Sequence, residues 1–104
     1  IESKVVARVF GRETPCSSSK GQIGHTLGAA GAMGAAHCWL SAAGSNAARR
    51  LPPHLWDGDA DAELLSTSLV AAGTRLAPAA RGIFVCNTIA FGGNNAVLVI
   101  GRTE

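Results

Sequence analysis

The first apolar positions of the chain repeat with the period of a helix. Val5 and Val9 stand four residues apart, which places them on one face of a helix. This spacing predicts a helix over residues 2–10, and Gly11 is a typical helix end. An extended segment is expected next, over residues 14–18.

A second helix is predicted over residues 26–43, where most side chains are small. Glycine and alanine dominate this stretch, and Gly44 ends it. A helix so poor in side chains lets another backbone or a substrate come very close. The composition therefore predicts a buried helix beside an active site. Residues 20–25, which precede it, are flanked by glycines and predict a loop.

The second half of the chain is predicted to form loops and strands. Residues 51–63 contain two adjacent prolines and an Asp-Gly pair, which cannot continue a helix. Stretches rich in β-branched residues predict strands at 83–87 and 96–100, and a shorter one within 64–70. Residues 90–95 join the last two strands in a glycine-rich connection that is longer than a tight turn.

Composition limits the classes of protein to which the chain can belong. Its 104 residues form one domain at most, taken as residues 1–104. Only 15% of the residues are charged and 47% are hydrophobic, so we expect a surface that is largely covered by something else. The net charge of +2 and the dispersed basic residues give no support for a nucleic-acid partner. The apolar run at 27–43 is too short and too diluted by glycine to span a membrane.

The three cysteines, Cys16, Cys38 and Cys86, include no Cys-x-x-Cys pair. Their odd number and their spacing argue against a zinc site or a disulfide scaffold and for a reducing, cytoplasmic compartment. No signal peptide is recognisable in residues 1–15. A cysteine in a chain with histidines can suggest a thiol nucleophile, but we interpret all three as buried small hydrophobic residues. We predict neither a metal site nor a cofactor.

Residues 17–32 carry the strongest chemical signal. They lead from a polar run through a glycine-flanked lysine and histidine into the small-residue helix. This layout places His25 at a helix N-terminus, where backbone N–H groups can fix its tautomer and an anion is favoured. A nearby cationic Lys20 would disfavour the imidazolium; the alternative is a solvated surface lysine. His37 lies roughly 120° further around the helix, and His54 is expected to be exposed.

Two motifs in the chain resemble those of a known family. Residues 18–32, Ser-x-Lys-Gly-x-x-Gly-His-x-Leu-Gly-Ala-Ala-Gly-Ala, resemble the second histidine motif of the β-ketoacyl-acyl carrier protein synthases, the elongating condensing enzymes. Residues 87–96, Asn-Thr-Ile-Ala-Phe-Gly-Gly-Asn-Asn-Ala, are similar to the C-terminal Gly-Phe-Gly-Gly loop of that family. The proline-led acidic segment 51–61 and the helix at 2–11 match in order as well. The resemblance covers essentially all of this chain, but only the C-terminal part of the family's chain.

The resemblance implies an α/β fold, namely the C-terminal portion of a thiolase-like layered αβαβα domain whose mixed sheet closes with antiparallel strands. It implies decarboxylative Claisen condensation of malonyl-acyl carrier protein with an acyl-enzyme thioester, in fatty acid or polyketide-type biosynthesis. The partner would be acyl carrier protein, and the full-length enzyme would form a homodimer or heterodimer. This chain lacks the family's nucleophilic cysteine and its other catalytic histidine. We therefore expect a fragment that is inactive by itself and whose exposed faces need the missing half.

The resemblance also assigns roles to individual residues. His25 would donate a hydrogen bond to the malonyl thioester carbonyl and stabilise the enolate, and Lys20 would be buried in the active-site network. The backbone N–H of Phe91 would complete the oxyanion hole for the acyl thioester, and its ring would gate the acyl pocket. Gly92 and Gly93 would let this loop move. The alternative is that Phe91 is a core residue at a strand end.

Departures from the family's pattern keep other functions open. Gly34 stands where the family usually has a glutamate that can pair with the lysine, and Asn94 replaces a usual threonine. Ile89-Ala90 replaces Phe-Gly, so Ile89 is expected to line the acyl pocket and to give an unusual acyl preference. The alternatives are a catalytically inactive partner subunit of the chain-length-factor kind, and a small independent module that binds an anion with its glycine loops.

Overall fold

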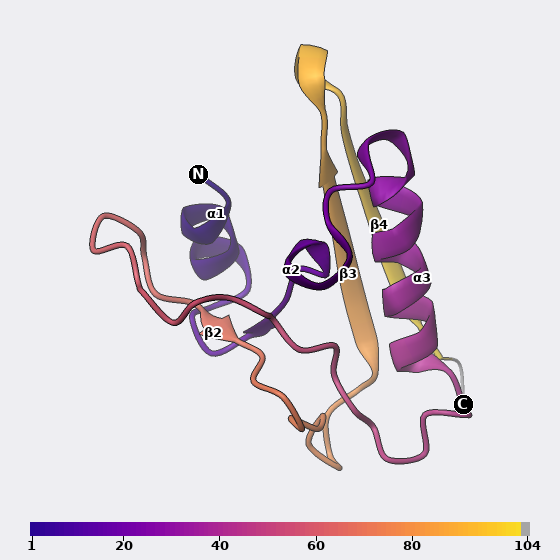
Figure 1. Cartoon of the computed structure of the whole chain (residues 1–104). Helices are drawn as coiled ribbons and strands as arrows, with labels where there is room; N and C mark the ends of the chain where they lie inside the picture. The colour runs from indigo at the N-terminus through magenta and orange to yellow at the C-terminus, as the bar shows by residue number, and fades with distance from the viewer. Residues whose placement is uncertain (103–104) are drawn as a thin grey trace.

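A helix packed along a β-hairpin forms one end of the molecule (Figure 1). Helix α3 (Ala30–Ala42) lies against strands β3 (Ile83–Ile89) and β4 (Asn95–Gly101). The two strands pair antiparallel, with Cys86 opposite Leu98. The prediction of antiparallel closing strands is therefore confirmed.

Two glycines explain how closely α3 approaches the hairpin. A Cβ atom added at Gly34 would lie 2.8 Å from Sγ of Cys86, which is closer than packed atoms tolerate. At Gly31 the nearest atom would be Oγ1 of Thr88, at 3.1 Å. The small residues of this helix predicted that another backbone or a substrate comes close to it. In the structure, strand β3 of the same chain makes this approach.

The other half of the molecule contains a small parallel strand pair. The structure is a computed structural model, and it describes residues 1–102. Strand β1 (Pro15–Cys16) pairs parallel with β2 (Ser68–Leu69), two residues from each segment. Helix α1 (Glu2–Val9) precedes this pair and lies apart from α3 (Figure 1). The helix predicted over residues 2–10 is confirmed.

The buried core is small and lies where distant segments meet. Among the described residues only Leu51, Val70 and Cys86 are buried, each at most 8% exposed. Val70 links three segments, because its N–H donates to the carbonyl of Cys16 at 2.9 Å and its carbonyl accepts the N–H of His54 at 2.7 Å. The parallel pair is therefore extended on one side by the segment that contains His54.

The region before α3 differs from the prediction. Residues 20–25, predicted as a loop, contain the short helix α2 (Lys20–Ile23). The helix predicted over 26–43 begins with a 3₁₀ turn, η1 (Leu27–Ala29), before α3. Gly24 separates the two with φ 76° and ψ 178°, a backbone conformation that is practically reserved for glycine. One continuous helix is therefore impossible here.

The predicted strands are present, but their ends are shifted. The strand predicted within 64–70 is reduced to β2, because its partner β1 has only two residues to pair with. The strand predicted at 83–87 continues for two more residues, and the one at 96–100 gains a residue at each end. The connection at 90–95 contains the short turn η2 (Phe91–Gly93).

One face of the hairpin is left uncovered by the described residues. Successive side chains of a strand point to opposite faces, so those that do not face α3 form a second set. Four apolar side chains of this set are more than half exposed: Ile83 55%, Ile89 67%, Val97 61% and Val99 68%. An apolar face of this kind normally lies against another structure.

Candidate functional site

His25 lies in the turn between α2 and η1, where its side chain is exposed. Nδ1 of His25 accepts a hydrogen bond from the backbone N–H of Leu27 at 3.3 Å. When Nδ1 is an acceptor, a neutral imidazole carries its proton on Nε2. His25 is therefore arranged as a hydrogen-bond donor through Nε2. The sequence had placed this histidine at a helix start, where backbone N–H groups could fix its tautomer.

An unusual backbone turn produces this hydrogen bond. Leu27 has φ 50°, in the left-handed region that a leucine seldom occupies. Such a conformation costs on the order of 1–3 kcal/mol and persists where the surrounding structure enforces it, often at functional sites. Gly24, on the other side of His25, has φ 76°. The two residues turn the chain sharply on both sides of the imidazole.

Lys20 is the first residue of α2, and it is exposed. Its backbone N–H donates to Oγ of Ser18 at 3.3 Å. In the described chain Lys20 is therefore a solvated side chain, and the buried position that the resemblance implies stays a prediction for the complete protein. A positive charge here still lies on the helix that leads into His25.

The histidine turn and the glycine loop lie at the same end of the helix–hairpin layer. Helix α3 begins where β3 ends, as Figure 1 shows. The contact between Gly31, in the first turn of α3, and Thr88, near the end of β3, fixes this arrangement. Residues 25–30 and 89–93, far apart in the sequence, are thereby brought to one end of the fold.

Phe91 is almost fully exposed, at 98%, and is not a core residue. Its carbonyl accepts a hydrogen bond from Nδ2 of Asn94 at 3.3 Å, and the N–H of Ala90 donates to the carbonyl of Asn94 at 2.9 Å. Gly92 and Gly93, with φ 76° and 78°, permit the tight return of the chain. The loop presents a bulky ring beside two backbone positions in a conformation that favours glycine.

The cysteines are not arranged as nucleophiles. Cys86 is buried, whereas Cys16 and Cys38 are only half-buried. Burial raises the pKa of the Cys38 thiol above its ordinary value, and the neighbouring Cys86 raises it further. Burial also raises the pKa of Cys16, with a smaller contribution from the charge of Glu2. A raised pKa lowers the thiolate fraction, which agrees with small packing residues.

Two side chains make contacts with or from the segment before His25 that the sequence does not predict. His54, expected to be exposed, is half-buried, and its Nδ1 accepts the backbone N–H of Ser18 at 3.1 Å. Nε2 of Gln22 donates to the carbonyl of Pro53 at 2.6 Å. No periodicity or motif in the sequence indicates these contacts, since they join segments more than 30 residues apart.

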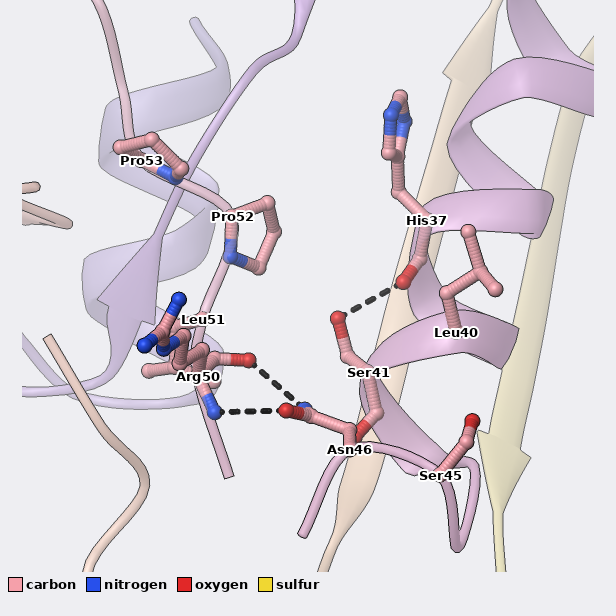
Figure 2. A pocket seen from close by; sticks show the side chains of 9 residues that line it. All are labelled: His37, Leu40, Ser41, Ser45, Asn46, Arg50, Leu51, Pro52 and Pro53. Carbon is pink, nitrogen blue, oxygen red and sulfur yellow. Dashed lines mark hydrogen bonds between the residues drawn. The ribbon is translucent and has the colours of Figure 1, made fainter. Parts of the chain in front are cut away.

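A separate hollow of about 420 Å³ opens between the second half of α3 and the segment that runs to Pro53 (Figure 2). His37 lines it, and its Nδ1 is buried without a hydrogen-bond partner among residues 1–102. Asn46 bounds the hollow through hydrogen bonds of 2.9 and 3.0 Å with the backbone of Arg50. None of the predicted site residues lines the hollow, so His37 and His25 do not share a site.

The part of the chain that the structure describes has neither a candidate metal site nor a candidate membrane span. It holds no group of three or more histidine, cysteine or acidic side chains placed to bind a metal ion. Over the same residues, no helix combines the length and the apolar character needed to cross a membrane.

Comparison with known proteins gives one match. Residues 1–53 match the family described as "Beta-ketoacyl synthase, C-terminal domain". No curated protein and no solved structure matches the chain. The matched half includes Lys20 and His25, whereas the glycine loop lies outside it.

Proposed function

Because the chain belongs to the β-ketoacyl synthase family, through its C-terminal domain, we propose that it supplies the malonyl-decarboxylating part of a condensing active site. Family membership makes the chain part of a condensing enzyme, in a family that acts with acyl carrier proteins. The finer proposal is a β-ketoacyl-acyl carrier protein synthase that joins malonyl-acyl carrier protein to an acyl thioester. The observation that carries it is the hydrogen bond from Leu27 to Nδ1 of His25.

The proposed role of His25 follows from the direction of that bond. Decarboxylation breaks the bond between the malonyl carboxylate and C2, releases CO₂ and leaves an electron pair that moves onto the thioester oxygen. An N–H donor aimed at this oxygen forms a stronger hydrogen bond with the enolate than with the ground-state carbonyl. Nε2 of neutral His25 is such a donor, and its exposure leaves it available to a bound thioester.

Lys20 supports this role through its charge. Its ammonium group places a positive charge on the helix that leads into His25, where the malonyl carboxylate is proposed to bind. Lys20 is exposed in the described chain, so solvent and salt screen this effect. We therefore propose a contribution that is smaller than that of His25.

The loop of Phe91 is proposed to act on the other substrate, the acyl thioester. Its backbone N–H would donate to the thioester oxygen, and its exposed ring would cover the acyl pocket that Ile89 helps to line. Gly92 and Gly93 supply the backbone freedom that such a gate requires. The support for this part is the exposure of the ring and the packing of Gly31 against Thr88, which brings the glycine loop to the end of the fold where α3 begins.

The acyl group must be carried by a nucleophile other than the cysteines of this chain. Cys86 is buried, and the pKa values of Cys16 and Cys38 are raised by burial. We therefore propose that the chain is part of a longer synthase that supplies the nucleophilic cysteine. An inactive partner subunit of the chain-length-factor kind is the outcome expected if the complete protein has no such cysteine.

The proposal is tested by separating the two half-reactions in the complete synthase. In the His25→Ala variant, release of CO₂ from malonyl-acyl carrier protein should fall about 10²–10³-fold, the usual loss when one oxyanion donor is removed. Transfer of an acyl group to the nucleophilic cysteine should remain close to wild type. Wild-type CO₂ release by the variant would contradict the proposal.

A further inference from the structure

The segment that leads into His25 is not stabilised by its own secondary structure. Helix α2 has only four residues, all of them exposed. A single helical turn of this length is unstable in water without tertiary contacts. Its position, and with it the position of the following turn, must come from another part of the chain.

Two hydrogen bonds join this segment to residues 53–55. The backbone N–H of Ser18 donates to Nδ1 of His54 at 3.1 Å. The side-chain amide of Gln22 donates from Nε2 to the carbonyl of Pro53 at 2.6 Å. The bonds lie near the two ends of α2, so they fix its orientation as well as its distance. Figure 1 shows the later segment passing beside α2.

Close backbone contact completes the junction. Gly21 packs directly against the carbonyl of Leu55, and a Cβ atom at this position would overlap it. Gly21 and Gln22 lie within α2, whereas Ser18 precedes the helix and contacts His54 through its backbone N–H. Only glycine, which has no Cβ atom, permits α2 to come this close to the backbone of Leu55.

The 53–55 segment, meaning Pro53, His54 and Leu55, is itself firmly held. The backbone N–H of His54 donates to the carbonyl of Val70, one of the three buried residues, at 2.7 Å. The rings of His54 and Trp56 meet edge to face, with centroids 6.4 Å apart. The segment is therefore a fixed support for α2 rather than a mobile loop.

We propose that the 53–55 segment positions His25 for malonyl decarboxylation, with His54 as the positioning residue. This inference rests on the proposed function of His25. His54 acts through the Ser18–Gly24 backbone and does not contact the substrate. Its neutral Nδ1 must accept the N–H of Ser18, a role that a side chain with an oxygen in the same place can fill.

The test compares two variants of the complete synthase. His54→Ala removes the acceptor, and His54→Asn places Oδ1 close to the former Nδ1. We expect His54→Ala to lower kcat for CO₂ release by about tenfold or more, since small misplacement of a catalytic group is costly. His54→Asn should restore most of this loss, and acyl loading should change little in either variant. Equal kcat values for the two variants, whether low or at the wild-type level, would overturn the proposal.

A second readout does not depend on catalysis. Amide hydrogen exchange of residues 18–25 should accelerate in His54→Ala and in Gly21→Ala, but not in His54→Asn. Gly82→Ala is the matched control, because a Cβ at Gly82 meets only a ring atom of Phe84 at an ordinary 3.8 Å. Unchanged exchange in both His54→Ala and Gly21→Ala would overturn the positioning contact. A different outcome separates the two proposals. If His25→Ala releases CO₂ at the wild-type rate while exchange is accelerated in His54→Ala and Gly21→Ala, the proposed function of His25 is refuted. The positioning contact between His54 and Ser18 is then still supported.

Discussion

At the scale of single residues, the direction of two hydrogen bonds defines the chemistry of this chain. His25 and His54 both accept a backbone N–H at Nδ1, from Leu27 and Ser18 respectively. Both neutral rings therefore carry their proton on Nε2. In the proposed function, Nε2–H of His25 is the donor to the enolate oxygen. In His54 the functional atom is Nδ1, which accepts the N–H of Ser18. Protonation would abolish both acceptors, because an imidazolium has an N–H on each nitrogen.

Cys38 provides a prediction about pH at the same scale. Its pKa is raised by burial and by Cys86, so the folded protein holds the thiol proton more tightly than the unfolded chain. The corresponding stability is present below the unfolded pKa and is lost as the pH rises from there through the folded pKa. We expect Cys38 in the folded synthase to react with iodoacetamide more slowly than in urea at pH 8, with the difference shrinking at higher pH. Equal rates by mass spectrometry at all pH values would contradict this.

The surroundings of some of these residues can be predicted from the sequence and those of others cannot, for a physical reason. The surroundings of His25 follow from its neighbours Gly24 and Leu27, so a local motif was sufficient to place it. The hydrogen bond of His54 joins it to Ser18, 36 residues away, and no local pattern contains that information. The exposure of Lys20 is likewise a property of the folded surface rather than of its neighbours in sequence.

At the scale of elements, the packing of α3 on the hairpin determines where the site lies. Gly31 meets Thr88 and Gly34 meets Cys86, so the helix can approach only a strand with compact side chains at those positions. The departure of Gly34 from the family's usual glutamate is explained here, because the sulfur of Cys86 occupies the space beside it. This packing holds the start of α3 next to the end of β3.

The Gly34→Ala variant tests this packing. The added methyl would lie 2.8 Å from Sγ of Cys86, so we expect the free energy of unfolding to fall by about 1–3 kcal/mol, as in other overpacked cores. A second substitution, Cys86→Ala, should recover part of that loss by opening the space. Gly28→Ala is the matched stability control, because nothing lies within 4 Å of a Cβ there. Chemical denaturation of the complete synthase measures all three, and equal stability of Gly34→Ala and Gly28→Ala would contradict the packing account.

The glycine loop gives a prediction about substrate choice. Ile89 is 67% exposed and Phe91 98% exposed, so both side chains are free to contact an acyl chain. Ile89→Phe should shift chain-length selectivity by about tenfold, the effect of one or two methylene contacts. Phe91→Ala should relax this selectivity and slow acyl loading. Single-turnover transfer from carrier proteins of graded chain length measures both, and unchanged profiles would mean that the loop is only a connection.

Elements could be predicted where the local sequence pattern was strong. The prediction was wrong where contacts with distant parts of the chain determine the structure. The helix over residues 2–10 was predicted from apolar spacing, and the two closing strands from their β-branched residues. Helix α2 was not, because four residues carry no periodic signal and the 53–55 segment holds them in place. The interruption before α3 was missed because the backbone angle of Leu27 is unusual for a leucine.

At the scale of the whole molecule, the chain exposes too much surface for an independent globular protein. Its accessible surface is 7770 Å², whereas a folded monomer of its mass is expected to expose roughly 5,400 Å². The excess is comparable to a large protein interface, and the outward face of the hairpin contributes to it. This agrees with the low charge of the sequence, which predicted a covered surface.

The isolated chain is therefore predicted not to be a stable monomer. Among residues 1–102 only three are buried, so little apolar area opposes the loss of chain entropy on folding. We expect thermal unfolding followed by circular dichroism to be broad, and sedimentation to show association. A sharp, cooperative transition of a monomer in dilute solution would contradict this prediction.

The central claim, that His25 acts as a donor through Nε2, is tested most directly by CO₂ release from malonyl-acyl carrier protein in two amide variants. His25→Gln places an amide N–H near the position of Nε2, whereas His25→Asn places one near Nδ1. The account predicts that the complete synthase with His25→Gln retains activity within about tenfold of wild type, and that His25→Asn loses about as much as His25→Ala, some 10²–10³-fold. Equal rates for the glutamine and asparagine variants would contradict it.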